Sequence, residues 1–454
     1  MQPDVVILIY TNHTTTRLQY IVNTLFGNEG QMTDSLENFL QYEGAKINYS
    51  LNRIGDNLFW IKPYGLLSEE GISQQNTACF EWRGWQVFFK TAGDIPFDIF
   101  SASFYLVSRY EEYLIHKVDE YERYAYTNSL AYKENFLHLP LVNLWMKELK
   151  KMLQQKYNSL PISDSCFTFL PTYDIDIAYR YLHQPLWVNL FGFYKDLLKT
   201  DIDKVIERGN VYSGKTQDPF DVYDHLDELH ERYQLQPVYF FLMAAKRKGV
   251  DKNLPRGNRA MSDLIKRHAG KYAIGIHPSW QSGTIKTIRN PMANEDDFEA
   301  EELVNPLLEK EIHALNEIKG SKTLSSRQHY IKMNLPGTYR ILIEMGITKE
   351  YSMGYGSTNG FRASFTLPFY WYDLPKEKVT VLRIYPFCYM EATSYFEQKF
   401  TAEQAAVELQ QYYDVVKQVN GQLITIFHNH FLTLQSQWLP WRKMHEQFLK
   451  KNCS

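Results

Sequence analysis

Two aspartates two positions apart are the residues of this chain best placed to do chemistry. Asp174 and Asp176 follow the run Phe167–Tyr173, whose alternation of Phe and Thr predicts a β-strand. Side chains at positions i and i+2 of a strand leave on the same face, so the two carboxylates lie close together. Like charges that close raise one pKa unless a cation lies beside them. The pair therefore indicates a metal ligand beside a general base; the alternative is a strand end with solvated carboxylates.

Histidines at the ends of other predicted strands could complete such a metal site. His277 directly follows the strand-like run Tyr272–Ile276, and a neutral imidazole is a good ligand for a borderline divalent ion such as zinc. A second histidine four residues later would complete a local motif, but Gln281 occupies that position. His329, in the predicted strand Ser326–Lys332, is the candidate for the missing ligand. An ordinary strand histidine is the alternative for His329.

A third pair of histidines follows the apolar run Gln422–Phe427. His428 and His430 would lie on the same face of one strand. One of them, with His428 preferred, is the candidate general acid that protonates a leaving group. The alternative is a structural role for one or both.

An arginine and an aromatic cluster are candidates for supporting roles. Arg362, in Gly360–Arg362, could orient the base carboxylate through a bidentate pair. The aromatic run Phe369–Tyr372 could line a sugar subsite, or it could belong to the core. The side chains that we expect to contact substrate are Tyr173, Trp280, Phe369, Trp371 and His430.

Predicted strands alternate with predicted helices in the second part of the chain, which indicates βα units and a parallel sheet. About seven strands favour a closed or nearly closed barrel, in which the carboxyl ends of the strands meet at one face. The candidate residues would then converge on one pocket. The predicted strands are Cys166–Asp174, Pro237–Met243, Tyr272–His277, Ser326–Lys332, Tyr351–Tyr355, Val379–Pro386 and Leu423–His428.

The first part of the chain predicts a smaller α/β domain, over residues 1–160. It contains three short strand-like runs followed by two helical stretches, Ile99–Ile115 and Leu139–Tyr157. The segment Asn158–Asp164 reads as a linker to the barrel, over residues 161–454.

Composition narrows the class of protein. The chain has 454 residues, 44% of them hydrophobic, and a net charge of −3, which gives no nucleic-acid or anionic-membrane signal. Its four scattered cysteines form no C-x-x-C pair. It contains no run of about 18 apolar residues and no signal-peptide pattern. We therefore expect a cytoplasmic protein that binds neither nucleic acid nor membrane, with its oligomeric state undetermined.

In order along the chain, these motifs resemble those of the polysaccharide deacetylases, carbohydrate esterase family 4 and its relatives. Thr172–Asp176 is similar to the family's first motif, Gly275–Ser279 to the histidine-bearing second, Gly360–Phe369 to the third and Ile424–His428 to the last. The segment Arg327-Gln328-His329 matches one found in bacterial relatives that carry an extra N-terminal domain.

The resemblance covers about residues 165–440 and implies a distorted (β/α)7 barrel that removes N- or O-linked acetyl groups from a sugar, using a divalent metal. By that resemblance Asp174 is the base, Asp176 a metal ligand, Arg362 the partner of the base and His428 the acid. With His277 and His329 as further ligands, zinc is the expected ion.

Two other functions stay open at this stage. The missing histidine at Gln281, together with the 15% aromatic content, also fits a carbohydrate-binding barrel protein without catalysis. A related barrel hydrolase that acts on a non-sugar C–N bond is the other alternative.

Overall fold

The computed structural model describes residues 7–157, 166–283, 286–289 and 301–453. The predicted linker Asn158–Asp164 and the boundary between residues 160 and 161 lie outside these ranges. No helix in the part that the structure describes is long and apolar enough to cross a membrane.

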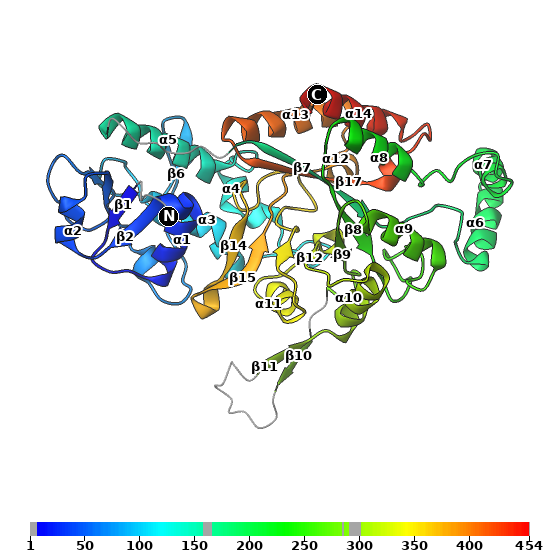
Figure 1. The fold of residues 1–454 in the computed structure, drawn as a ribbon, viewed down its shortest axis with the longest axis horizontal. Coiled ribbons are helices and arrows are strands. Elements are labelled where there is room, and N and C mark those ends of the chain that lie inside the picture. Colours follow the sequence, from blue (N-terminus) through cyan, green and yellow to red (C-terminus); the bar gives the residue numbers. More distant parts are fainter. Residues whose placement is uncertain (1–6, 158–165, 284–285, 290–300, 454) are drawn as a thin grey trace.

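A nine-stranded sheet forms the frame of the second part of the chain (Figure 1). Its strands follow the order β14-β15-β13-β12-β9-β8-β7-β17-β16, and all neighbouring pairs are parallel except β14 with β15. The strands are β7 (Thr168–Ile175), β8 (Val238–Leu242), β9 (Ala273–His277), β12 (Ser325–Ser326), β13 (Lys349–Glu350), β14 (Phe369–Asp373), β15 (Lys378–Ile384), β16 (Tyr389–Met390) and β17 (Gln422–His428).

The expected parallel α/β architecture is present, but the barrel is not closed among the described strands. No pairing between the described residues joins the edge strands β14 and β16. Two predicted strands are also misplaced. The chain leaves β12 after Ser326 and turns through η6 (His329–Ile331), and β13 ends before Tyr351. After β13 the Ser352 N–H donates to the Glu350 carboxylate at 2.9 Å. This side-chain acceptor takes the place of a neighbouring strand.

The faces of this sheet have different partners. The helices that contact its strands include α9, α10, α11 and α13. The opposite face holds a separate apolar cluster that includes Val238, Phe240, Tyr351, Phe387 and Ile424. The Arg327 guanidinium lies over Phe240 of this cluster, 4.5 Å from the ring centre. The helices after residue 166 are α6 (Leu186–Leu198), α7 (Ile202–Tyr212), α8 (Tyr223–Arg232), α9 (Arg259–Ala269), α10 (Pro306–Lys319), α11 (Gly337–Glu344), α12 (Glu391–Phe396), α13 (Ala402–Gln418) and α14 (Leu439–Asn452).

Local signals explain where some of these helices begin and end. A capping box begins α13: the Thr401 side chain accepts from the Gln404 N–H, and the Gln404 side chain accepts from the Thr401 N–H. Helix α10 ends at Gly320, whose φ of 70° is one that glycine adopts without strain. Strands β10 (Lys286–Arg289) and β11 (Glu301–Val304) form a separate antiparallel pair.

Residues 7–157 build a second, four-stranded parallel sheet in the order β2-β1-β3-β4, together with a short β5–β6 hairpin. Its elements are β1 (Ile7–Tyr10), β2 (Gly30–Thr33), β3 (Ala45–Asn48), β4 (Phe59–Trp60), β5 (Phe80–Trp82), β6 (Trp85–Val87), α1 (Thr16–Phe26), α2 (Leu36–Gln41), α3 (Ile99–Val107), α4 (Leu130–Lys133) and α5 (Leu141–Lys156). Residues 99–115 are thus helical only as far as Val107, before a 3-10 turn at Tyr110–Tyr113.

This N-terminal region packs against the nine-stranded sheet at β14 and β15 (Figure 1). The Tyr20 hydroxyl donates to the carbonyl of Tyr370 at 2.9 Å, and Arg17 forms an ion pair with Glu377. One continuous apolar core includes residues of both parts.

Candidate metal centre and active site

The carboxyl ends of four parallel strands bring the candidate residues together. Asp174 is the second-last residue of β7 and Asp176 directly follows that strand. His277 ends β9, His428 ends β17, and His329 lies three residues beyond β12. The register places His428 beside Asp174 on neighbouring strands. The predicted convergence of residues about 250 positions apart is therefore present, because parallel strands deliver their ends to the same edge.

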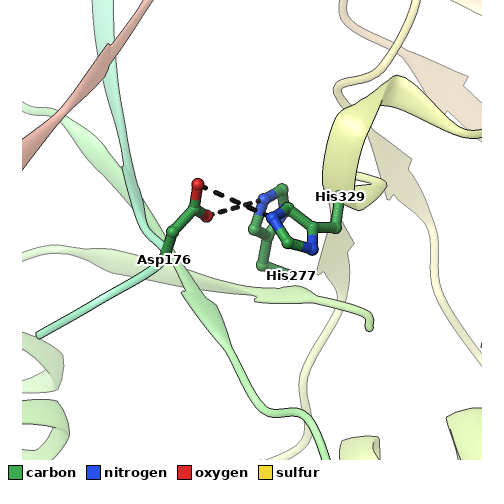
Figure 2. Close-up of side chains that lie close together, drawn as sticks. All are labelled: Asp176, His277 and His329. Atoms are coloured by element: carbon green, nitrogen blue, oxygen red, sulfur yellow. Dashed lines mark ion pairs between the residues drawn. The ribbon is translucent and has the colours of Figure 1, made fainter. Parts of the chain in front are cut away.

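Asp176, His277 and His329 form a compact group of possible metal ligands, with one donor atom from each within 4.8 Å of the others (Figure 2). Asp176 Oδ1 lies 3.3 Å from His277 Nε2, and Oδ2 lies 3.6 Å from His329 Nε2. Gln281 is not part of this group; His329 supplies the third side chain.

Hydrogen bonds on the far side of both rings fix which nitrogen faces Asp176. His277 Nδ1 lies 2.6 Å from the carbonyl oxygen of Arg327, which can only accept, so Nδ1 carries the proton. His329 Nδ1 lies 2.8 Å from Oδ1 of Asp251, a fully buried carboxylate. In the neutral rings, each Nε2 then presents its lone pair to Asp176, the arrangement typical of metal-ligating histidines.

The donor set fits a borderline divalent cation. A tetrahedral ion held at about 2.0–2.1 Å by nitrogen and oxygen separates its ligand atoms by about 3.4 Å, close to the spacings observed here. Among the described residues, Asp176 Oδ1 is buried without a hydrogen-bond partner. A buried carboxylate oxygen facing two imidazole nitrogens needs a cation or protons between them.

In the absence of a cation, protons take this role. Burial alone would raise the pKa of Asp176, but His329 and His277 hold it well below its ordinary value. Burial would lower the pKa of His329, whereas Asp176 and Asp251 raise it to about 9. A bound divalent ion would displace the proton from His329.

Asp174 lies beside this group, and its partner is Arg327. Arg327 Nη1 donates to Asp174 Oδ1 at 2.9 Å and to Thr172 Oγ1 at 2.6 Å, while Nε donates to the carbonyl of Tyr351. The other carboxylate oxygen of Asp174 lies 3.8 Å from His277 Nε2. One oxygen is therefore held and the other faces the site.

The prediction that Arg362 orients Asp174 is wrong. Arg362 donates through Nε and Nη2 to both carboxylate oxygens of Glu112, at 2.8 and 2.6 Å. Glu112 belongs to the N-terminal region and also pairs with Arg109. A bidentate pair does form at Arg362, but with a buried carboxylate that joins the two parts of the chain.

His428 faces Asp176 from the opposite side of the group. Its Nε2 lies 3.6 Å from Asp176 Oδ2, and its Nδ1 lies 2.8 Å from Oε1 of the fully buried Glu391. Burial lowers the pKa of His428, but Glu391 and Asp176 more than compensate and raise it to about 10. Nδ1 of His428 thus faces Glu391, and Nε2 points into the site toward Asp176.

A cavity of about 580 Å³ opens over these side chains. Of the predicted substrate contacts, His430 lines it, beside His428. Trp280 does not line it; its ring packs on the Lys332 ammonium at 3.8 Å.

The other three predicted substrate contacts are wrong, because their side chains are buried elsewhere. Strand alternation places Tyr173 on the opposite face from Asp174, where its hydroxyl contacts His230 and His445. Phe369 and Trp371 belong to the apolar core.

Sequence reasoning missed three residues that position the site: Asp251, Arg327 and Glu391. Arg327 belongs to the segment Arg327-Gln328-His329, but that segment does not indicate a pair with Asp174, and Asp251 and Glu391 belong to no local pattern. All three are charged side chains that are fully buried, and each contacts a candidate catalytic or ligand residue.

Comparisons with known proteins add the following. A family model described as a family of unknown function (DUF7033) matches residues 7–158. No curated protein matches the chain. A candidate polysaccharide deacetylase from Mycobacterium smegmatis is similar at 12% identity and a TM-score of 0.37, covering 65% of this chain and 86% of its own.

Two further solved structures give comparable values. The PuuE allantoinase has 12% identity and a TM-score of 0.36, over 63% of this chain and 83% of its own. The polysaccharide deacetylase Bc1974 from Bacillus cereus has 11% identity and a TM-score of 0.29, over 63% and 87%. At these identities and TM-scores the likenesses carry no argument about function.

Proposed function

We propose that this chain is a metal-dependent hydrolase that removes an acetyl group from a saccharide. The observation that supports it is one arrangement of side chains. Asp176, His277 and His329 can hold a divalent ion, Asp174 stands beside them with one oxygen free, and the protonated His428 faces them from the other side. A site that only binds a metal would need neither a base such as Asp174, positioned by Arg327, nor an acid such as His428.

Each residue has a role that follows from its contacts. Asp174 accepts a proton from the attacking water through the oxygen that Arg327 leaves free. His428 donates its Nε2 proton to the departing amine or alcohol, and Glu391 holds the ring so that this proton points into the site. A divalent ion supplies Lewis acidity that activates the water and the acyl carbonyl.

Zinc is the ion that we propose for this site. Two imidazole nitrogens and one carboxylate leave an open position, as in catalytic zinc sites. Asp251 then accepts from His329 Nδ1 as a carboxylate that orients a ligating histidine. A catalytically silent binding protein was suggested by the missing histidine at Gln281 and by the aromatic content; the place of His329 beside Asp176 and His277 supports the hydrolase instead.

Metal content and acetate release test the proposal together. The purified protein is expected to hold about one zinc per chain and to release acetate from an N- or O-acetylated oligosaccharide. Asp176→Asn should lose both, whereas the matched control Asp56→Asn, at a fully exposed aspartate, should lose neither.

Two results would refute the proposal. If Asp176→Asn left metal content and acetate release unchanged, the group of Asp176, His277 and His329 would not be the metal centre. Turnover only of a cyclic or linear amide without a sugar, in the same substrate panel, would assign the site to a non-sugar C–N bond instead.

A further inference from the structure

A hairpin of the N-terminal region lies at the candidate active site. Residues 118–124, here called the 118–124 hairpin, are closed by an antiparallel bridge between Val118 and Tyr124. The Asp119 N–H donates to the Arg123 carbonyl at 2.8 Å, and the Asp119 carboxylate accepts from the N–H groups of Tyr121 and Arg123. The tip of the hairpin is thus fixed by its own hydrogen bonds.

The hairpin is attached to the loop that carries His329. Arg123 Nη1 donates to the carbonyl of Tyr330 at 2.7 Å, and Glu122 forms an ion pair with Lys332 at 2.8 Å. The ring of Tyr121 lies 5.1 Å from the ring of Tyr330. Because Tyr330 directly follows His329, the hairpin contacts the same short loop that carries this candidate metal ligand.

Side chains of the hairpin line the same cavity as the catalytic group. Glu120, Tyr121 and Arg123 form part of its wall, together with Asp176 and His428. The cavity, of about 580 Å³, lies within the size range of small-molecule binding sites and is much larger than an acetyl group needs. The additional space must hold the part of the substrate that carries the acetyl group.

The chemistry of this wall fits a neutral polyhydroxylated ring. Tyr121 is partly exposed, and Phe396, which lines the same cavity, is 50% exposed. Besides the histidines, four carboxylates and three basic side chains line it, so neither sign of charge dominates: Glu120, Asp174, Asp176 and Glu397, and Arg123, Lys252 and Lys399. An aromatic face suits the C–H face of a sugar, and carboxylates accept hydrogen bonds from its hydroxyls.

We propose that the 118–124 hairpin is the outer wall of a saccharide-binding subsite, in which Tyr121 stacks against a sugar ring next to the acetylated one. This inference rests on the proposed function and extends it, since it gives the N-terminal region a direct part in substrate binding. A truncated chain without residues 7–157 would then lack one side of its substrate site.

Oligosaccharide binding tests the subsite independently of turnover. The probe is a tetramer of N-acetylglucosamine, titrated into the zinc-loaded full chain by calorimetry. Tyr121→Ala is expected to weaken binding about five- to tenfold, the size of one aromatic stacking contact. The control, Tyr132→Ala, removes an exposed tyrosine of the same region that also contacts one other tyrosine ring and does not line the cavity. It should leave binding unchanged.

A second substrate separates the subsite from the catalytic group. Hydrolysis of p-nitrophenyl acetate needs only the catalytic group, so Tyr121→Ala should leave its rate within about twofold of wild type while the KM for the tetramer rises. Equal loss on both substrates would overturn the subsite, as would a tetramer that does not bind the wild type or binds Tyr121→Ala equally well. Tetramer binding that depends on Tyr121 but leads to no acetate release would refute the proposed function and retain the subsite.

An independent feature is the apolar surface of α6, which with α7 projects from the rest of the molecule (Figure 1). Eight large apolar side chains of this one helix are 40–81% exposed: Leu186, Trp187, Leu190, Phe191, Phe193, Tyr194, Leu197 and Leu198. At 100° per residue they fill one continuous arc of about 160°. The polar side of α6 is already covered by α7, where Arg208 contacts Asn189 and Asp196.

This apolar face exceeds what a monomer ordinarily exposes. Taking roughly 200 Å² for each of these side chains, four aromatic and four leucine, the eight exposed fractions add up to about 1,000 Å². A typical patch on a monomer covers 300–600 Å², and each partner of a stable dimer buries about 800 Å². Over α6 and α7 the charges balance, with basic Lys195, Lys199, Lys204 and Arg208 against acidic Asp196, Asp201, Asp203 and Glu207. Nothing there favours an anionic lipid surface.

We infer that a second copy of this chain covers the apolar face of α6, with the two helices packed about a twofold axis. Sedimentation at micromolar concentration should show a dimer for the wild type and for Val407→Glu, which alters an exposed apolar residue on α13. Leu190→Glu should give a monomer with unchanged metal content. A monomeric wild type would overturn the inference, as would co-sedimentation with phosphatidylcholine vesicles in place of self-association.

Discussion

Replacing Arg327 by lysine tests which arginine supports the base. Arg327 is fully buried and reaches three acceptors at once: Asp174, Thr172 and the Tyr351 carbonyl. A lysine keeps the charge but has no planar fork, so it cannot hold all three. Loss of the charge-assisted bond to Asp174 costs about 1.5–3 kcal/mol. If that loss falls on the transition state, kcat drops about 10- to 150-fold.

Steady-state kinetics on an acetylated oligosaccharide, with zinc content measured in parallel, is the assay. The Arg327→Lys enzyme should keep its zinc, because Arg327 touches His277 only through a backbone carbonyl. Its KM should change less than its kcat, since Asp174 acts on water rather than on the sugar.

Arg362→Lys is the matched comparison, because Arg362 is equally buried and also pairs with a carboxylate. Its partner Glu112 belongs to the N-terminal region and does not line the cavity, so this change should lower the free energy of unfolding and leave kcat per folded molecule near wild type. The assignment of Arg327 would be refuted if Arg362→Lys lowered kcat at constant zinc content while Arg327→Lys did not.

Three more outcomes follow from the buried partners of the site and of the interface. Asp251→Asn should weaken zinc binding about 10- to 100-fold, measured by competition with a chelator, because His329 loses the acceptor that orients it. Glu391→Gln should move the basic limb of the kcat–pH profile to lower pH, because burial then lowers the pKa of His428 without the opposing carboxylate; an unmoved limb would exclude His428 as the acid. Burial raises the pKa of Glu112, but Arg362 and Arg109 lower it to about 2, against an ordinary value of 4.5. Ionised Glu112 therefore adds about 3 kcal/mol to the free energy of unfolding above pH 4.5, and this contribution is lost as the pH falls through about 2. In denaturant titrations, the free energy of unfolding of Glu112→Gln should depend less on pH between these two values.

The convergence of the residues at the strand ends was predictable from the sequence, because it depends on local rules. The alternation before Asp174 and Asp176 sets their common face, and a parallel sheet brings strand ends to one edge. Those two rules were enough to bring His277, His329 and His428 to the same place as the aspartates, although the predicted strand around His329 is a 3-10 turn.

Partner choice was not predictable, because it is settled by tertiary packing. The sequence around Arg362 indicates a residue able to hold a carboxylate, and it does hold one. No local sequence pattern indicates that this carboxylate belongs to Glu112, 250 residues earlier, rather than to Asp174. Glu391 and Asp251 are likewise recognisable only once the chain has removed them from water.

The aromatic residues follow the same rule and change the interpretation of the N-terminal region. Phe369 and Trp371 are aromatic and near a candidate motif, but the pleat and the packing of residues 7–157 against β14 bury them. That packing also carries the 118–124 hairpin to the cavity, where Tyr121 is partly exposed. The same interface thus buries two aromatic side chains and places another at the cavity. In the proposed subsite, this region, which has no catalytic motif, would determine which saccharide binds.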